Sequence, residues 1–267
     1  MPWRRVLGVL LLVAMQGGAE PAAAERRVPL RWMTGARTMR AIAALDPDVA
    51  QAVFGNASAI GLNDAFPGAT RGLATPSYAA FEAMIDADAI DPDVTVAMYD
   101  IERWNATPLV EQQHPIDYIR RFAALARSHG YLVVITPHPK LVAVEGGECV
   151  QGPDESVWDA YIRCDITGQA AAVADVVETQ AQVLQRTPVA YRRFVAATAR
   201  QARAANANVT FISGLSTSPG YRATPEMLLR AARSVEGIVD GFYFSLARGR
   251  FPHVAVEFLR RQAVSVA

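Results

Sequence analysis

Short apolar runs rich in β-branched and aromatic residues recur along the chain, separated by segments with apolar residues at helical spacing. Seven runs have the length and composition of buried strands: 28–34, 58–63, 94–102, 131–136, 174–180, 208–214 and 241–246. Helical spacing is clearest at 115–129, 188–206, 225–235 and 252–262, and each of these segments begins with proline. The pattern therefore predicts a regular alternation of strands and helices.

Alternation of strand and helix at about 30 residues per unit is typical of a parallel sheet covered by helices. At that period the chain has room for a closed (β/α)8 barrel, so we expect a single α/β domain of the TIM-barrel type. Only seven strands are evident, and the helix at 252–262 follows the seventh closely, so either the pattern misses one strand or the eighth unit is incomplete. An open doubly wound sheet is the alternative, but the glycine-rich first turn of a dinucleotide-binding fold is absent.

The first 24 residues have the order of a secretion signal: Arg4 and Arg5, an apolar run over 6–15, and small residues ending at Ala24. The apolar run is only about half of the ~20 residues that a membrane-spanning helix needs. We therefore expect cleavage after Ala24 rather than a retained anchor. Residues 25–267 would then form the exported domain, extracellular or periplasmic, without membrane attachment.

The charge balance argues against a nucleic-acid partner. The chain has 26 basic and 26 acidic residues, of which 24 and 25 would remain after signal cleavage. A nucleic-acid-binding protein normally shows an excess of basic residues gathered on one face. This near-neutral composition does not provide such an excess.

The two cysteines, Cys149 and Cys164, both lie in the part of the chain that would be exported. An isolated pair in an oxidising compartment usually forms a disulfide, and a loop of about 15 residues gains about 3 kcal/mol in the chain-entropy model. A metal site would need further cysteine or histidine ligands at suitable spacing, and none are present in the sequence. We therefore predict a structural disulfide, no catalytic metal and no other cofactor.

The apolar strand at 94–102 ends in two carboxylates, Asp100 and Glu102, followed by Trp104. Residues two apart on a strand face the same way, so both carboxylates are expected to project together at the rim of the barrel, where such folds carry their reactive groups. Two close carboxylates repel, which raises the pKa of one and keeps it protonated as a general acid. The alternative is that both carboxylates pair with arginines and only hold the rim loops.

Other strand ends supply further candidates. Glu178 is the best second carboxylate, acting as nucleophile or base opposite Glu102, unless it belongs with Gln180 to a polar layer inside the barrel. His138 lies between two prolines that restrict its backbone, and it would bond either a substrate hydroxyl or the loop itself. The side chains expected to bind substrate at the rim are Trp32, Asp64, Trp104, His138, Gln180 and Tyr243.

The strand end Asp100-Ile101-Glu102 resembles the Asp-x-Glu signature of barrel-type glycoside hydrolases and, more distantly, of their chitinase-like family. The resemblance covers this one strand and the general alternation of the chain. It implies that Glu102 is the acid and that Asp100 orients it. Met98 stands where the family has a further aspartate, which puts substrate-assisted chemistry on an acetamido sugar in doubt.

These features together predict a secreted, bacterial glycosidase that hydrolyses a polysaccharide or cell-wall glycan with Glu102, Asp100 and Glu178. Two alternatives stay open. One is a non-catalytic protein that binds glycans or cell walls through the same aromatic rim. The other is an exported hydrolase of another bond, such as an ester, with His138 and a rim serine at its site.

Overall fold

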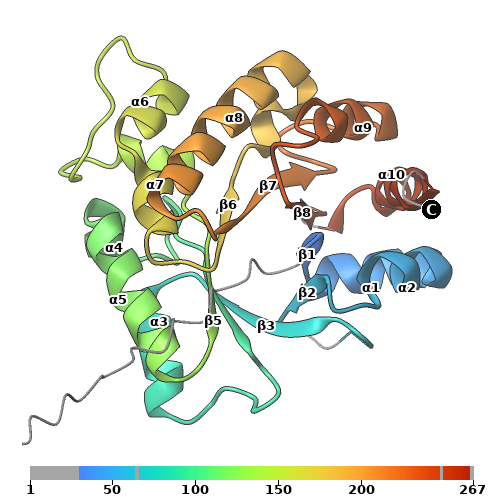
Figure 1. Ribbon diagram of the computed structural model, residues 1–267, viewed down its shortest axis with the longest axis horizontal. Coiled ribbons are helices and arrows are strands. Elements are labelled where there is room, and N and C mark those ends of the chain that lie inside the picture. The colour runs from blue at the N-terminus through green and yellow to red at the C-terminus, as the bar shows by residue number, and fades with distance from the viewer. Residues whose placement is uncertain (1–29, 64–65, 247–248, 265–267) are drawn as a thin grey trace, which may run out of the picture.

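Eight parallel strands pair in sequence order and close into a barrel, because β1 pairs with both β2 and β8. The computed structural model describes residues 30–63, 66–246 and 249–264, and Figure 1 shows the helices arranged around the strands. The strands are β1 Trp32–Gly35, β2 Ala59–Leu62, β3 Thr70–Thr75, β4 Val96–Tyr99, β5 Leu132–Ile135, β6 Val176–Thr179, β7 Thr210–Ser216 and β8 Gly241–Ser245. The chain is therefore a (β/α)8 barrel of the TIM type, as the alternation predicts.

The four segments with helical spacing are all helices in the structure. The helices are α1 Ala36–Leu45, α2 Pro47–Phe54, α3 Tyr78–Asp86, α4 Leu109–Gln113, α5 Pro115–Ser128, α6 Val157–Arg163, α7 Ile166–Ala171, α8 Pro188–Ala205, α9 Pro225–Ser234 and α10 Pro252–Val264, with 3-10 helices η1 Pro139–Ala143 and η2 Gln182–Arg186. Proline in the first turn starts α5, α8 and α9, where its missing N–H costs nothing. Within the described ranges no helix has the length and apolarity to cross a membrane.

The strand that the sequence pattern missed is β3, and with it the barrel has all eight strands. The inward positions of β3 include Gly72, where an added Cβ would lie 2.9 Å from Leu62 Cδ2. Side chains of neighbouring strands fill the barrel at this point, and β3 therefore has no apolar run. Its Arg71 points to solvent and forms ion pairs with Asp91 at 2.9 Å and Asp93 at 3.1 Å.

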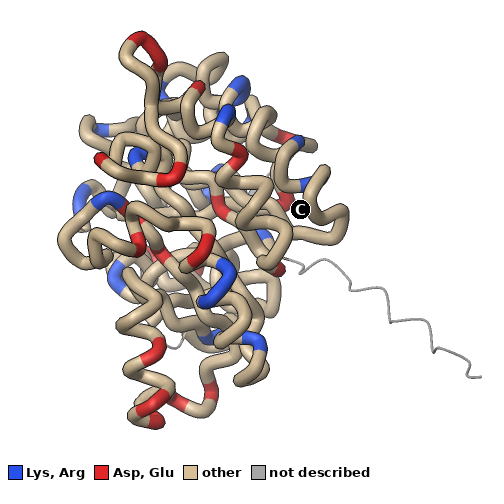
Figure 2. Tube along the Cα trace, turned by 90° about the vertical axis from the view of Figure 1, so that its left-hand side faces the viewer, with Lys and Arg blue, Asp and Glu red and all other residues tan. Residues whose placement is uncertain are grey.

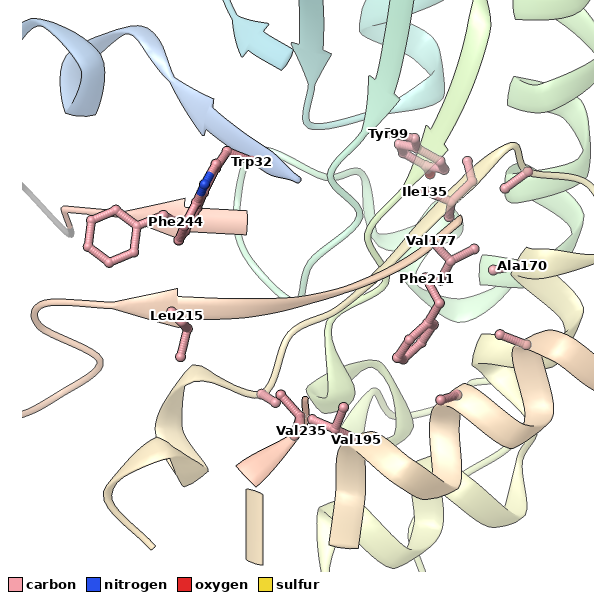
Figure 3. Packing of buried hydrophobic residues seen from close by; sticks show 14 of the residues in the cluster. Trp32, Tyr99, Ile135, Ala170, Val177, Val195, Phe211, Leu215, Val235 and Phe244 are labelled. Atoms are coloured by element: carbon pink, nitrogen blue, oxygen red, sulfur yellow. The ribbon is translucent and has the colours of Figure 1, made fainter. Parts of the chain in front are cut away.

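Alternate residues of each strand belong to two separate cores. The inner core fills the barrel and consists of Leu30, Met33, Ile60, Leu62, Val96, Met98, Val134, Val176 and Ile212. The residues between them face the surrounding helices, and Figure 3 shows Tyr99, Ile135, Val177 and Phe211 in this outer core. A side chain two residues beyond an inner-core residue therefore points into the carboxyl-end mouth of the barrel.

The predicted disulfide is present and joins Cys149 to Cys164. It closes the segment between η1 and α7, where Arg163 also forms a 2.8 Å ion pair with Glu155. Tyr161 within this segment is fully buried and supports the outer core. Basic and acidic residues are interspersed on the side of the fold in Figure 2. The predicted signal, residues 1–24, lies outside the described residues.

Candidate active site

The inward-facing positions change from apolar to polar at the carboxyl ends of β4, β5 and β6. On β4, Asp100 follows the inner-core residue Met98 by two positions, and on β6 Glu178 follows Val176 in the same way. When the pairing of β4 with β5 and of β5 with β6 is continued by one residue, three side chains fall in one row across the strands: Asp100, Thr136 and Glu178. Two residues further along each chain come Glu102, His138 and Gln180. The sequence-predicted carboxylates are thus brought to one sector of the mouth.

Asp100 is held by two hydrogen bonds from neighbouring strands. Thr136 Oγ1 donates to Asp100 Oδ1 at 3.0 Å, and Gln180 Nε2 donates to the same oxygen at 3.2 Å. Burial, with the added charge of Glu102, raises the pKa of Asp100 to about 7 against the opposing effect of these hydrogen bonds. Asp100 therefore changes its charge near neutral pH.

Glu102 is less deeply buried than Asp100 and lies nearer to solvent. Burial raises the pKa of Glu102, while a hydrogen bond from Gln180 and the positive charge of Lys140 act in the opposite direction. Gln180 Nε2 also donates to the backbone oxygen of Thr136 at 3.1 Å. One amide thus connects the polar ends of β4, β5 and β6 and positions both carboxyl groups of the Asp-x-Glu segment.

Glu178 lies deeper, with 1% of its surface exposed. Gln182 Nε2 donates to its Oε1 at 3.3 Å. Burial raises the pKa of Glu178 well above its usual range, and the charges of Asp100 and Glu102 add to this effect. Space for the carboxyl group comes from Gly214 on β7, where an added Cβ would lie 2.5 Å from Glu178 Oε1. Burial and the neighbouring charges therefore favour the protonated form of Glu178, which lies beneath Asp100 and Glu102.

Tyr243 reaches the same sector from β8 and packs against the inner core. Burial raises the pKa of its phenol, and the charges of Asp100, Glu178 and Glu102 raise it further. The hydroxyl therefore stays protonated and is available as a neutral hydrogen-bond donor. Its role in binding substrate remains a prediction.

His138 is neutral at physiological pH. Burial lowers the pKa of His138 to about 4, and the nearby Lys140 lowers it further. The backbone N–H of Lys140 donates to His138 Nδ1 at 3.0 Å, which leaves the ring proton on Nε2. Among the described residues no serine hydroxyl is hydrogen-bonded to His138.

Trp104 presents an exposed ring whose polar edge is already bonded. Its indole is 41% exposed, and Nε1 donates to Thr107 Oγ1 at 2.7 Å. The Thr107 hydroxyl donates in turn to the Pro76 carbonyl at 2.6 Å, and Gln112 Nε2 donates to the Trp104 carbonyl at 2.8 Å. These bonds fix the ring two residues beyond Glu102, where its free face can stack against a flat apolar surface.

The expected role of Trp32 at the rim is wrong. Trp32 is the first residue of β1, at the amino end of the barrel, and only 4% of it is exposed. It alternates with the inward-facing Met33 and so points outward. Its ring packs against Phe244 and Phe258 at centroid distances of 6.4 and 6.2 Å, and Figure 3 shows the first pair. Asp64 lies outside the described residues.

Four residues of the site escaped the sequence reasoning: Thr136, Lys140, Gln182 and Gly214. The sequence contained a signal for Gln182, because it continues the alternate polar positions Glu178 and Gln180. Thr136 and Gly214 had none, since their roles depend on which strands neighbour β4 and β6. Lys140 had no signal either. It is the only lysine in the sequence, but composition does not show that a side chain lies near the site.

The carboxyl groups of this site do not form a recognisable metal-binding arrangement. Within the ranges that the structure describes, no group of three or more His, Cys, Asp or Glu side chains could hold a metal ion. The absence of a catalytic metal or other cofactor remains a prediction.

Comparison with known proteins finds only distant likenesses, all among solved structures. No protein-family model and no curated protein sequence matches the chain. A Schiff-base-forming fructose-1,6-bisphosphate aldolase is 14% identical, with 90% of this chain and 96% of that chain covered and a TM-score of 0.47. A candidate alpha-L-fucosidase from Bacteroides thetaiotaomicron is 10% identical, with coverages of 70% and 60% and a TM-score of 0.45. Triosephosphate isomerase from Bartonella henselae is 11% identical, with coverages of 89% and 99% and a TM-score of 0.45.

Proposed function

We propose that the protein is an exported glycoside hydrolase that acts on a polysaccharide or cell-wall glycan. The observation that carries this proposal is the group of three carboxyl groups, Asp100, Glu102 and Glu178, whose pKa values are all raised at the mouth of the barrel. Glycoside cleavage requires a carboxylic acid that is protonated near neutral pH and a second carboxyl group nearby. Export is inferred from the signal sequence at residues 1–24.

Glu102 is the general acid in this proposal. It is the least buried of the three carboxyl groups, so it can reach the glycosidic oxygen of a bound sugar. Its raised pKa favours the protonated form that must donate to the leaving group. Gln180 and Lys140 stabilise the carboxylate that remains after donation.

Asp100 and Glu178 take different supporting roles. Asp100, fixed by Thr136 and Gln180, supplies negative charge to the oxocarbenium-like transition state. Glu178 is buried and its raised pKa favours the protonated form, which suits a proton-holding partner beneath Asp100 better than an ionised nucleophile. A protonated Glu178 also reduces the charge repulsion among the three groups.

Three neighbouring side chains are suited to binding a sugar. Trp104 offers a fixed, exposed ring for stacking on the apolar face of a pyranose. Tyr243 and His138 each carry a proton that can be donated to a hydroxyl, on the phenol oxygen and on Nε2. This combination of one stacking surface and several neutral donors is appropriate for an uncharged ring with many hydroxyl groups.

The test is sugar release from plant and cell-wall polysaccharides by the purified protein, with Glu102→Gln assayed in parallel. Glu145→Gln is the matched control, because Glu145 is an exposed carboxylate on the loop after η1. We expect hydrolysis by the wild type and by the control, and a loss of at least about a hundredfold in Glu102→Gln. Glycan binding without turnover by any variant would instead support the non-catalytic binding protein.

A further inference from the structure

The mouth of the barrel has a basic half opposite its carboxylate sector. The segments that follow β6, β7 and β8 contain no aspartate or glutamate: 180–187, 217–224 and 246–251. Each of them contains arginine, and the first turn of α1 adds another beside the end of β8. We call this group the basic half-rim: Arg37, Arg186, Arg222 and Arg250. Because these segments connect strand ends to helix starts, all four residues lie on the carboxyl face that carries the candidate active site.

Aromatic rings hold two of these guanidinium groups without neutralising them. The Arg186 guanidinium lies 5.1 Å from the centre of the Tyr221 ring. The Arg222 guanidinium lies 5.0 Å from the centre of the Phe251 ring and 3.5 Å from His253 Nε2. A ring contact of this kind orders the side chain and leaves its N–H donors and its positive charge available to a ligand.

The loops of the basic half-rim are also connected to one another. Thr217 Oγ1 donates to the backbone oxygen of Arg250 at 2.7 Å, which joins the segment after β7 to the segment after β8. The contact of Arg222 with Phe251 makes a second connection between the same two segments. The arginines are therefore carried on a linked surface, and their spacing is set before a ligand arrives.

Within the part of the chain that the structure describes, no carboxylate is paired with this group. Among the described residues none of the four arginines forms an ion pair, although eight other arginines do so elsewhere on the molecule. Unpaired arginines on linked loops beside a candidate active site point to negative charge in the ligand, since guanidinium groups bind carboxylate, sulfate and phosphate groups through paired hydrogen bonds.

We propose that the glycan bound at this site is anionic, with acidic substituents that bind Arg186, Arg222 and the rest of the basic half-rim. This inference rests on the proposed function, because that function makes the ligand a glycan. The negative charge of the ligand is inferred from the arginines alone. The two halves of the mouth then have different functions. The carboxylate sector cleaves the glycosidic bond, and the basic half-rim holds charged sugars of the same chain.

The experiment measures binding of the purified protein to polygalacturonate and to fully methyl-esterified polygalacturonan, which has the same backbone without the charge. Dextran sulfate, which has sulfate groups but no carboxylates, and a phosphorylated mannan are tested in the same way, to distinguish carboxylate, sulfate and phosphate as the recognised group. The variants are the double substitution Arg186→Gln with Arg222→Gln, and the control Arg200→Gln. Arg200 is an exposed arginine in the second half of α8, away from the mouth.

We expect at least one acidic polymer to bind with an affinity that falls as salt is added, and the esterified polymer to bind far less. The double variant should lose about tenfold or more in affinity for that polymer, because each guanidinium contributes charge-assisted hydrogen bonds, and the control should lose nothing. Equal binding of the acidic and esterified polymers, no loss in the double variant, or no binding of any acidic polymer would overturn the inference.

Failure of the proposed function gives a different result. Arginine-dependent binding of an acidic polymer, with no hydrolysis of any glycan, would remove the glycosidase and keep the anionic ligand. Hydrolysis of a neutral glycan that is unchanged in the double variant would keep the glycosidase and remove the anionic ligand.

Discussion

Gln180 Nε2 lies 3.2 Å from Asp100 Oδ1 and connects the end of β6 to the end of β4 across the intervening β5. The same amide hydrogen-bonds to the Thr136 carbonyl at 3.1 Å and also to Glu102. The two carboxyl groups of the Asp-x-Glu segment therefore depend on a residue that is 80 positions away in sequence.

Replacing Gln180 should change the pH dependence of activity. Its hydrogen bonds lower the pKa of both Asp100 and Glu102, so Gln180→Ala raises both pKa values. Because the acid must be protonated, the high-pH limb of kcat/KM should move to higher pH in this variant. The control is Gln51→Ala, an exposed glutamine on α2. A limb that stays in place or moves to lower pH would show that Gln180 does not act through these carboxyl groups.

Asp100 should make the protein less stable as pH rises. Its pKa is raised from 3.8 to about 7 in the folded state, so the folded protein holds a proton that the unfolded chain has released. The stability that this proton supports is complete below pH 3.8 and is lost as pH rises through about 7. Asp100→Asn should therefore raise the free energy of unfolding at about pH 8 and change it little at about pH 4.

Urea unfolding at both pH values measures this difference, and Asp154→Asn, at an exposed position on the disulfide-closed segment, is the control. A stabilisation of Asp100→Asn that is equal at both pH values would contradict the raised pKa.

The folded protein should require glycine at position 214, because the neighbouring side chains leave no room for a Cβ. An added Cβ would lie 2.5 Å from Glu178 Oε1, within a row of buried side chains. Gly214→Ala should lower the free energy of unfolding by about 1–3 kcal/mol, because the core must shift to accept the methyl group. Gly35→Ala is the matched control on β1: nothing lies within 4 Å of its Cβ position, and its φ of −83° suits alanine. Equal thermal stability of the two variants would contradict this packing.

The disulfide should stabilise the segment between η1 and α7. Replacing both Cys149 and Cys164 with alanine removes a crosslink of sequence separation 15, which should cost about 3 kcal/mol in the free energy of unfolding. Chemical unfolding with and without a reducing agent measures the effect, and the reductant should change the wild type alone. A double variant as stable as the oxidised wild type would contradict the expectation.

The fold was predictable where strands carry their own apolar residues. Val96 and Met98 on β4 fill the barrel interior, so alternation and hydrophobicity reveal this strand. On β3 the inward Gly72 leaves that volume to Leu62 of the neighbouring strand, so the sequence there has no hydrophobic signal. The direction of the Trp32 side chain was not predictable either. It depends on where β1 begins, and residue propensity does not define that boundary.

The site was predictable where its signal is local. Asp100 and Glu102 follow a strand at a spacing of two, which directly predicts a shared direction. The connection by Gln180 and the space made by Gly214 are set by the closed order of β4 to β7, which no local pattern contains. The basic half-rim is likewise a property of three loops that become neighbours only when the barrel closes.

The most direct measurement of the role of Glu102 compares two substrates in Glu102→Gln: a polysaccharide and an aryl glycoside of the same sugar with a dinitrophenyl leaving group. The aryl group leaves without protonation, so only the polysaccharide needs the acid. Our account predicts that kcat/KM of the variant falls by at least about a hundredfold on the polysaccharide and far less on the aryl glycoside. An equal loss on both substrates would contradict the assignment of Glu102 as the general acid.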